Sequence, residues 1–167
     1  MLIRTEEVVD VPKIHAINRD AFDSATEADL VNALRSGTES VISLVAEEDG
    51  EIVGHIMFSP VQLTDAADVR AMALAPLAVT PERQRGGIGS ALVRAGLEEC
   101  QRLGIDAVFV VGHPTFYPRF GFNSASSAGF VCEFDVHDEA FMVAELVAGV
   151  LDGKKATVHF HPVFKEG

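Results

Sequence analysis

The stretch Pro76-Leu-Ala-Val-Thr-Pro-Glu-Arg-Gln-Arg-Gly-Gly-Ile-Gly-Ser90 joins the most apolar segment of the chain to its clearest amphipathic helix pattern, which begins at about Ile88. A strand, a glycine-rich turn and a helix in this order build an anion site, because consecutive backbone N–H groups converge at the positive end of the helix dipole. Glycine takes positive φ without a steric penalty, and we expect it at Gly86, Gly87 and Gly89. The stretch therefore predicts a phosphate or diphosphate site.

The same glycines would also suit a tight turn that binds no ligand. Two known phosphate-binding motifs do not match this stretch. A Walker loop needs Gly-Lys-Ser/Thr after four intervening residues, and the stretch has no lysine. A dinucleotide fingerprint needs a third glycine near Leu92 and an acidic residue after the next strand, where this chain has Gly112-His113-Pro114. What remains to be explained is Gln84-Arg85-Gly86-Gly87-Ile88-Gly89.

This segment resembles the Gln/Arg-x-x-Gly-x-Gly/Ala loop with which the GCN5-related N-acetyltransferase (GNAT) family binds the pyrophosphate of acetyl-coenzyme A. A second segment, Thr115 to Phe122, resembles the family's Tyr-x-x-x-Gly-Phe motif, with Tyr117 four residues before Gly121. Tyr117 is the only tyrosine of the chain. An aromatic-rich segment is most often part of a core, but its place one helix and one strand after the glycine loop favours a role at the coenzyme.

The resemblance implies an α/β (α+β) fold of the GNAT type, with a mixed central sheet flanked by helices and a single domain over residues 1–167. In that fold the parallel fourth and fifth strands splay apart. Independently, the apolar runs Ala71–Val79 and Ala107–Val111 flank one helix, which requires a parallel crossover. Pro76 cannot donate a ladder hydrogen bond and predicts a bulge or splay in the first of these strands.

The remaining elements follow from periodicity, caps and turn residues. Thr26 is the expected N-cap of a second helix that ends near Gly37, and Gly96 is expected to let the helix after the glycine loop approach the sheet closely. Glu48-Asp49-Gly50 predicts a hairpin turn, and the last three strands are expected to extend the sheet antiparallel. The expected elements are a strand at Leu2–Arg4, a helix from Asp10, and strands at Val41–Glu47, Ile52–Leu63, Phe130–Val136, Phe141–Leu146 and Thr157–Phe164.

Composition limits the partners. The chain has 167 residues, 48% of them hydrophobic, which suffices for one buried core. Its 25 acidic and 13 basic residues give a formal charge of −12, which argues against nucleic acid and anionic membrane surfaces and favours a neutral or cationic free partner. Coenzyme A is itself polyanionic, and Arg83, Arg85 and Arg94 supply a local positive exception around the loop.

The N-terminus has no basic and apolar leader pattern, and no apolar run approaches the roughly 18 residues of a membrane span, so we expect a cytoplasmic protein. Cys100 and Cys132 form neither a disulfide framework nor a CxxC pattern, and both are expected to be structural thiols. His159 and His161 alternate onto one face of the last expected strand. They lack neighbouring ligands at metal spacing, so no metal site is expected.

The resemblance also implies roles for single residues. Tyr117 is the expected general acid, since its reference pKa of about 10 lies near the value of about 8.5 for a thiol. The general base stays open between Glu27, His55, His113 and a water chain. Glu27 and Asp29 are candidates for contact with the acceptor amine, or else ordinary carboxylates at a helix start. The expected coenzyme contacts are Leu77, Ala78, Val79, Gln84, Arg85, Gly86, Gly87, Ile88, Gly89 and Ser90.

The predicted function is an N-acetyltransferase that moves an acetyl group from acetyl-coenzyme A to a primary amine of a small molecule, peptide or protein by direct attack in a ternary complex. One alternative is an acyl-coenzyme A binding or regulatory module of the same fold without turnover. A second alternative is an unrelated α/β nucleotide-binding domain. The acceptor, the acyl-chain preference and the oligomeric state, with a homodimer as one option, stay open.

Overall fold

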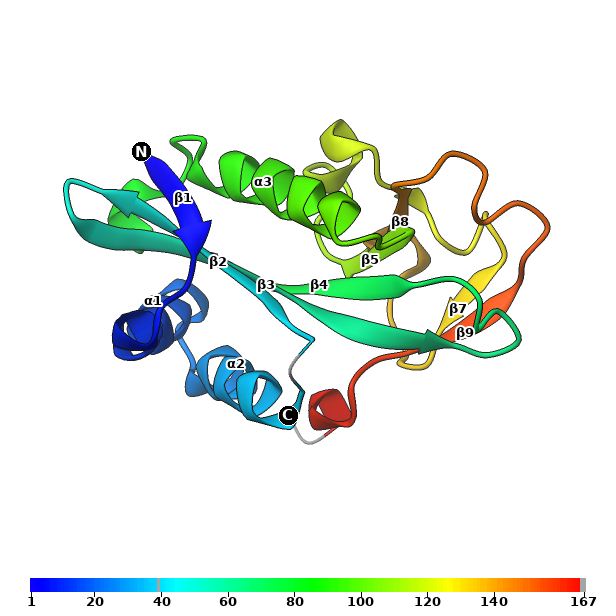
Figure 1. Cartoon of the computed structure of the whole chain (residues 1–167), viewed down its shortest axis with the longest axis horizontal. Helices are drawn as coiled ribbons and strands as arrows, with labels where there is room; N and C mark the ends of the chain where they lie inside the picture. The colour runs from blue at the N-terminus through cyan, green and yellow to red at the C-terminus, as the bar shows by residue number, and fades with distance from the viewer. Residues whose placement is uncertain (39, 166–167) are drawn as a thin grey trace. The chain divides into compact units, whose positions relative to one another are not determined.

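The computed structural model of the chain describes residues 1–38 and 40–165, which fall into two compact units. The first unit comprises Met1–Ser59, Ala75–Glu99 and Pro162–Gly167, and the second comprises Pro60–Leu74 and Cys100–His161. Figure 1 shows the elements along the chain. Among the described residues, no helix is both long enough and apolar enough to cross a membrane.

The sheet of the first unit contains strands β1 (Leu2–Thr5), β2 (Ile42–Glu48), β3 (Glu51–Leu63) and β4 (Ala71–Val79), which neighbour one another in that order. β1 pairs with β2 and β2 pairs with β3, both antiparallel. Asp49 and Gly50 turn the β2–β3 hairpin, both with positive φ, as an Asp-Gly pair at this position predicts. The hairpin prediction is confirmed.

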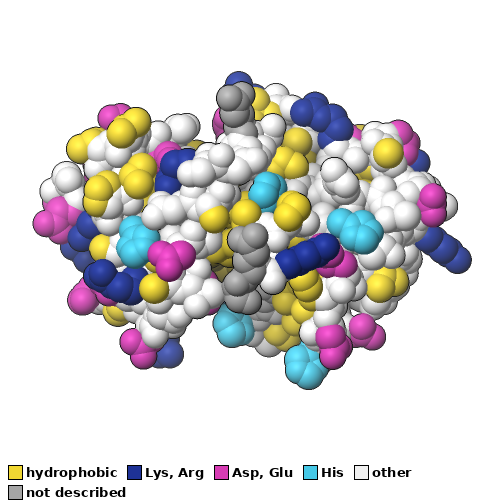
Figure 2. Space-filling view, turned by 90° about the horizontal axis from the view of Figure 1, so that it is seen from below, with side chains coloured by type: hydrophobic (Ala, Val, Ile, Leu, Met, Phe, Trp, Pro, Cys, Tyr) yellow, Lys and Arg dark blue, Asp and Glu magenta, His cyan; other side chains and the backbone are white. Residues whose placement is uncertain are grey.

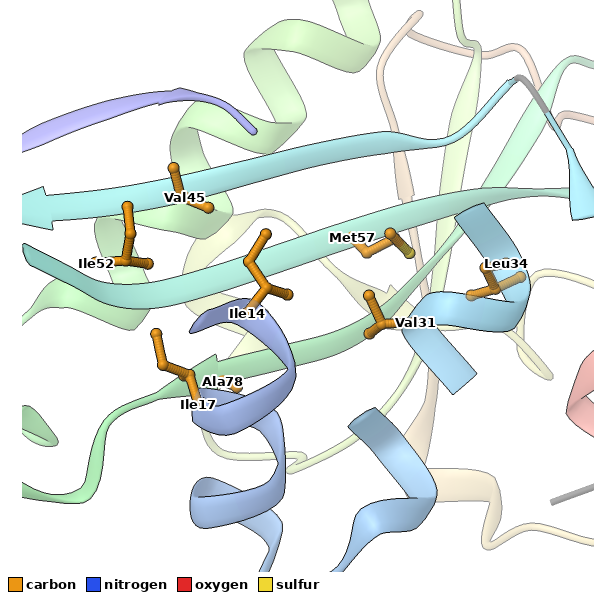
Figure 3. Packing of buried hydrophobic residues seen from close by; sticks show 8 residues of the cluster. All are labelled: Ile14, Ile17, Val31, Leu34, Val45, Ile52, Met57 and Ala78. Atoms are coloured by element: carbon orange, nitrogen blue, oxygen red, sulfur yellow. The ribbon is translucent and has the colours of Figure 1, made fainter. Parts of the chain in front are cut away.

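Helices α1 (Val11–Phe22) and α2 (Ala25–Gly37) cover one face of these strands, and α3 (Ile88–Arg102) lies on the other face (Figure 1). The α1–α2 side is held by a cluster of apolar side chains from both helices and from β2, β3 and β4, which converge in Figure 3. This cluster consists of Ile14, Ile17, Val31, Leu34, Val45, Ile52, Met57 and Ala78.

The start of α2 differs from the expected one. Ser24, not Thr26, is the N-cap: its hydroxyl oxygen accepts a hydrogen bond from the backbone N–H of Thr26 at 3.1 Å. A serine hydroxyl satisfies one of the helix's unpaired first-turn N–H groups, which places Thr26 inside the first turn. The end of α2 at Gly37 is as predicted.

The contact between α3 and β3 depends on two glycines. A Cβ atom on Gly96 of α3 would lie 2.4 Å from ring atoms Cε1 and Cζ of Phe58 on β3. A Cβ atom on Gly54 of β3 would lie 2.9 Å from Cδ1 of Leu92 on α3. Each element thus presents a glycine to a large side chain of the other, and the predicted close approach at Gly96 is confirmed.

In the second unit, the first residues of β4 pair in parallel with β5 (Ala107–Val111), which confirms the predicted crossover. The paired residues of β4 are Ala71, Met72 and Ala73, and all precede Pro76. β8 (Phe141–Glu145) pairs antiparallel with both β5 and β6 (Asn123–Ser124). The sheet is therefore mixed, as the fold class requires.

The C-terminal strands correct two expectations. β7 (Phe130–Cys132) and β9 (Ala156–His159) are shorter than predicted and pair in parallel with each other, while β9 is antiparallel to the end of β3. The backbone N–H of Phe160 donates a hydrogen bond to the carboxylate of Glu133 at 2.5 Å. This N–H group therefore bonds to a side chain and not to the backbone of a neighbouring strand. Pro162 has no N–H to donate, and a 3₁₀ helix begins there.

His159 and His161 therefore do not share a strand, contrary to the prediction, because β9 ends at His159. The His159 ring lies 2.8 Å from the Thr64 hydroxyl and 3.6 Å from a Glu133 carboxylate oxygen. Within residues 1–38 and 40–165, no group of three or more His, Cys, Asp or Glu side chains could hold a metal ion. Neither cysteine forms a disulfide, and burial is the main cause that raises the pKa of the Cys132 thiol.

Short 3₁₀ helices connect the longer elements. Their bounds are Val8–Asp10, Pro81–Arg83, Tyr117–Phe120, Asp138–Ala140 and Pro162–Lys165. Figure 2 shows a face on which Lys and Arg side chains are dispersed among acidic ones, and the described residues form no continuous basic area on that face.

The α3–β3 contact leads to a stability prediction. Gly96→Ala should lower the free energy of unfolding by about 1–3 kcal/mol, because the added methyl group overpacks against Phe58, even though alanine favours the helix. Denaturant unfolding measures the change. Glu98→Ala, at an exposed position of the same helix, should stay within about 0.5 kcal/mol of the wild type. A Gly96→Ala variant as stable as Glu98→Ala would contradict the close packing.

Candidate functional site

The glycine loop is tied to the end of β4. The backbone N–H of Thr80 donates to the carbonyl of Val53 on β3 at 2.9 Å. After the Pro81–Arg83 turn, the side-chain amide of Gln84 donates to the carbonyl of Val79 at 3.0 Å. Gln84 thus closes the loop back onto the strand that precedes it.

Positive φ occurs at Arg85 (67°) and Gly87 (90°). The prediction of positive φ is therefore correct for Gly87 and wrong for Gly86 and Gly89. Two left-handed residues separated by one other residue suffice to turn the chain into α3, so the other two glycines have no need of this conformation. A Cβ atom on Gly87 would meet nothing within 4 Å. The backbone of the loop is therefore open on its outer side at Gly87.

A surface pocket of about 400 Å³ lies at this loop. Four of the predicted coenzyme contacts line it, together with residues from the N-terminus, the β2–β3 hairpin and the Pro81–Arg83 turn. The first turn of α3 adds backbone N–H groups that have no partner within the helix, at the positive end of its dipole. The lining residues are Met1, Glu48, Glu82, Arg83, Gln84, Gly86, Gly87 and Ile88.

The positive charge around the loop is smaller than three arginines suggest. Nη1 of Arg83 lies 3.0 Å from a carboxylate oxygen of Glu48, so these two charges offset each other. The side chain of Arg85 is exposed within the loop, and Arg94 is exposed on α3. An open glycine backbone, a helix N-terminus and the Arg85 guanidinium together fit a diphosphate.

The other predicted contacts lie beside the loop. Ala78 is buried against Ile14 and Ile17 in the cluster of Figure 3, whereas Leu77 and Val79, which alternate with it along β4, are half-buried. Gly89 and Ser90 are half-buried in the first turn of α3. Their surroundings within the first unit match the expected order of strand, turn and helix.

Tyr117 lies in the second unit, in the short helix predicted between Pro114 and Phe120. Its side chain is 7% exposed, with the rings of Phe116 and Phe122 packed edge-on against it at centroid distances of 5.0 and 5.5 Å. Burial raises the pKa of Tyr117 to about 12, so the phenol stays protonated at neutral pH.

His55, one of the candidate bases, is fully buried and bonded through both ring nitrogens. The Asn18 amide donates to Nδ1 at 3.2 Å, so Nε2 carries the proton and donates to the Ser43 hydroxyl at 2.8 Å. The Ser43 hydroxyl in turn donates to the Glu6 carboxylate. Burial lowers the pKa of His55 to about 3, and the ring is neutral at physiological pH.

Glu6 ends this polar chain in a two-point ion pair with Arg35, at 2.6 and 2.9 Å. Burial alone would raise the pKa of Glu6, but the hydrogen bonds from Arg35 and Ser43 outweigh it and bring the pKa below its usual value. The partners of His55, namely Asn18, Ser43 and Glu6, were not predicted from the sequence. The available signal was a polar residue at a core-facing position in each of α1, β2 and β3.

The other candidates differ in surroundings. Glu27 is half-buried in the first turn of α2, and its Oε2 atom is buried with no hydrogen-bond partner among the described residues. Asp29 is exposed and lies 3.0 Å from Nε2 of His15. His113 is exposed beyond the end of β5, and its carbonyl accepts the N–H groups of Phe116 and Tyr117.

Comparison with known proteins agrees with this geometry. The model of the acetyltransferase (GNAT) family matches residues 11–122, which include the glycine loop and the Tyr117 segment. The chain belongs to the GNAT family. This membership removes the alternative of an unrelated nucleotide-binding domain.

Two relatives from Escherichia coli K12 bear the name uncharacterized N-acetyltransferase. YhbS is 36% identical over 165 residues, which cover 98% of each chain. YjhQ is 37% identical over 146 residues, which cover 83% of this chain and 81% of the relative.

Solved GNAT structures extend the similarity. YhbS of E. coli in complex with CoA superposes with a TM-score of 0.92 at 36% identity, covering 98% of this chain and 91% of that one. A GNAT acetyltransferase of Brucella melitensis in complex with acetyl-CoA gives a TM-score of 0.80 at 30% identity, covering 98% and 97%.

The buried His55 predicts a pH dependence of stability. Its pKa is lower in the folded than in the unfolded state, so the unfolded state binds more protons as the pH falls below about 6.5, and stability is lost. Between about pH 7 and pH 5 this histidine should account for a loss of about 2 kcal/mol, which His55→Gln abolishes. Denaturant unfolding at both pH values measures it.

The exposed His137 offers a matched control, since His137→Gln should retain the wild-type loss of stability between the two pH values. Equal losses in wild type and His55→Gln would show that His55 takes up its proton in the folded state.

Proposed function

We propose that this protein is an acetyl-coenzyme A-dependent N-acetyltransferase that acts on a primary amine of a small molecule, peptide or protein. The observation that carries the proposal is the glycine loop, open at Gly87 and set at the N-terminus of α3. Relatives at 36% and 30% identity with the same fold bind CoA and acetyl-CoA. We propose further that residues 1–167 act as one domain, in the cytoplasm, where thiols such as Cys100 and Cys132 stay reduced.

In this proposal the loop binds the coenzyme and β4 orients it. Backbone N–H groups from Gly86 to Ser90 and the Arg85 side chain hold the diphosphate, while the backbone of Leu77 to Val79 holds the pantetheine arm and polarises the thioester oxygen. Gln84 acts indirectly, because its hydrogen bond to Val79 keeps loop and strand together. Positioning of this kind supplies much of the rate of acyl transfer.

The reaction conserves atoms and charge. The lone pair of the neutral amine attacks the acetyl carbon, the C–S bond breaks, and one proton passes in net terms from the amine nitrogen to the sulfur. Tyr117 donates a hydrogen bond to the sulfur as negative charge develops there, and it delivers the proton when the bond breaks. It then regains a proton from solvent or from the acylated amine.

The raised pKa of Tyr117 limits how this donation proceeds. The buried phenol, with a pKa of about 12, is a weaker acid than a thiol with a reference pKa of about 8.5, so full proton transfer from Tyr117 to a free thiolate is unfavourable. Burial that disfavours the phenolate also disfavours a thiolate at the same place, which narrows the gap. The proton therefore moves together with C–S cleavage and not ahead of it.

Deprotonation of the incoming ammonium needs a base. Both ring nitrogens of His55 are bonded inside the core, which disfavours it for this role. Glu27, with a buried carboxylate oxygen that has no partner among the described residues, His113 and a water chain stay as candidates. Glu27 also stays a candidate for contact with the acceptor, whereas Asp29 already has His15 as partner.

The loop assignment can be tested by coenzyme binding. Gly87→Val should weaken acetyl-coenzyme A binding at least about tenfold, because a branched side chain is strained at φ +90° and fills the open space. Isothermal titration measures the dissociation constant. Gly153→Val, at φ +73° with equally open space, is the matched control and should bind like the wild type. Unchanged affinity in Gly87→Val would refute the loop assignment.

Turnover tests the enzymatic proposal. Release of coenzyme A thiol should be detected with at least one class in a panel of polyamines, aminoglycosides, lysine peptides and peptide N-termini. Tyr117→Phe should lower kcat about 100-fold with acetyl-coenzyme A binding retained, because only the proton donor is lost. Binding without turnover on any amine would favour the binding-module alternative, and full activity of Tyr117→Phe would remove the phenol as the acid.

A further inference from the structure

Gly112, the first residue after β5, lies against the ring of Tyr117. A Cβ atom on Gly112 would be 2.4 Å from Cε2 of that ring, 3.0 Å from Cδ2 and 3.4 Å from Cζ. Contacts under 3.0 Å force something to move, and these involve one whole edge of the phenol ring. The position therefore admits no side chain while the ring stays where it is.

The backbone conformation does not explain the glycine. Gly112 is not among the residues with positive φ, so no left-handed conformation requires glycine at this position. Its N–H donates to the carbonyl of Ala140 at 2.9 Å, a bond that alanine would also make. What glycine provides here is space for the ring.

Neither partner of this contact can easily shift. The Ala140 hydrogen bond holds the backbone of Gly112 on one side. The ring of Tyr117 is enclosed by Phe116 and Phe122, which pack edge-on against it. The N–H groups of Phe116 and Tyr117 both bond to the carbonyl of His113, which fixes the turn between Gly112 and the ring. A methyl group at Gly112 would therefore press directly on the phenol ring.

We propose that Gly112 is the positioning residue of Tyr117: the bare backbone at the end of β5 sets where the phenol lies and how deeply it is buried. Its effect on catalysis rests on the proposed function, in which Tyr117 donates to the leaving sulfur. The placement of the ring itself does not depend on that function.

The sequence allows a direct spectroscopic test. The chain has one tyrosine and no tryptophan, so tyrosinate absorbance reports Tyr117 alone. At about pH 10, the reference pKa of tyrosine, the buried phenol of the wild type should be about 1% ionised. In Gly112→Ala, with the ring displaced toward solvent, we expect about half ionisation, with circular dichroism confirming the fold. Val111→Ala, at the exposed neighbouring position, is the control and should match the wild type.

Kinetics test the link to catalysis. Gly112→Ala should lower kcat about as much as Tyr117→Phe, and the double variant should lose no more than either single variant, because both act on one proton donor. Wild-type ionisation in folded Gly112→Ala would overturn the proposal, as would multiplicative losses in the double variant. If Tyr117→Phe is fully active, the acid role fails, and the ionisation measurement still decides whether Gly112 places the ring.

A folding failure would also be informative. Should Gly112→Ala not fold, Tyr117→Ala in the same chain removes the ring that the methyl group meets. Recovery of the fold in that double variant supports the proposal. If the double variant stays unfolded while Tyr117→Ala alone folds, the obstacle is not the ring, and the proposal is wrong.

Discussion

The close contact between α3 and β3 is the constraint on which the glycine loop depends. Gly96 and Gly54 let each element receive a large side chain of the other, Phe58 and Leu92. This fixes the axis of α3, and with it the point at which the helix's first N–H groups emerge. A helix N-terminus attracts anions only within its first turn, so its placement by packing decides whether the loop can act as a binding site.

Some elements of this fold can be predicted from the local sequence. The continuous apolar runs of β4 and β5 predict their bounds to the residue, and the Asp49-Gly50 pair predicts the hairpin. The left-handed conformation of Arg85 has no such signal in the sequence, because arginine rarely adopts it. The C-terminal strands were predicted too long because the apolar alternation continues through residues whose hydrogen bonds go elsewhere, such as the one from Phe160 to Glu133.

Some properties of the site residues can likewise be predicted from local sequence, and others depend on tertiary packing. The spacing of Tyr117 and Gly121 and the order of the loop glycines are local, and they led to the correct family. The burial of His55 and the contact of Gly112 with the Tyr117 ring depend on tertiary packing, which the local sequence does not reveal. A residue type gives its chemistry, but burial decides whether that chemistry is available, as the opposite pKa shifts of His55 and Tyr117 illustrate.

The polar chain from Asn18 through His55 and Ser43 to Glu6 has a further consequence for folding specificity. Asn18 donates to His55, His55 donates to Ser43 and Ser43 donates to Glu6, so the protons along the chain have a single consistent order. A slip of β2 against β3 by one residue would turn Ser43 or His55 to the opposite face and leave buried polar atoms without partners. Apolar residues on these strands could tolerate other pairings. The hydrogen bonds of the buried His55 therefore favour a single pairing register of the β2–β3 hairpin.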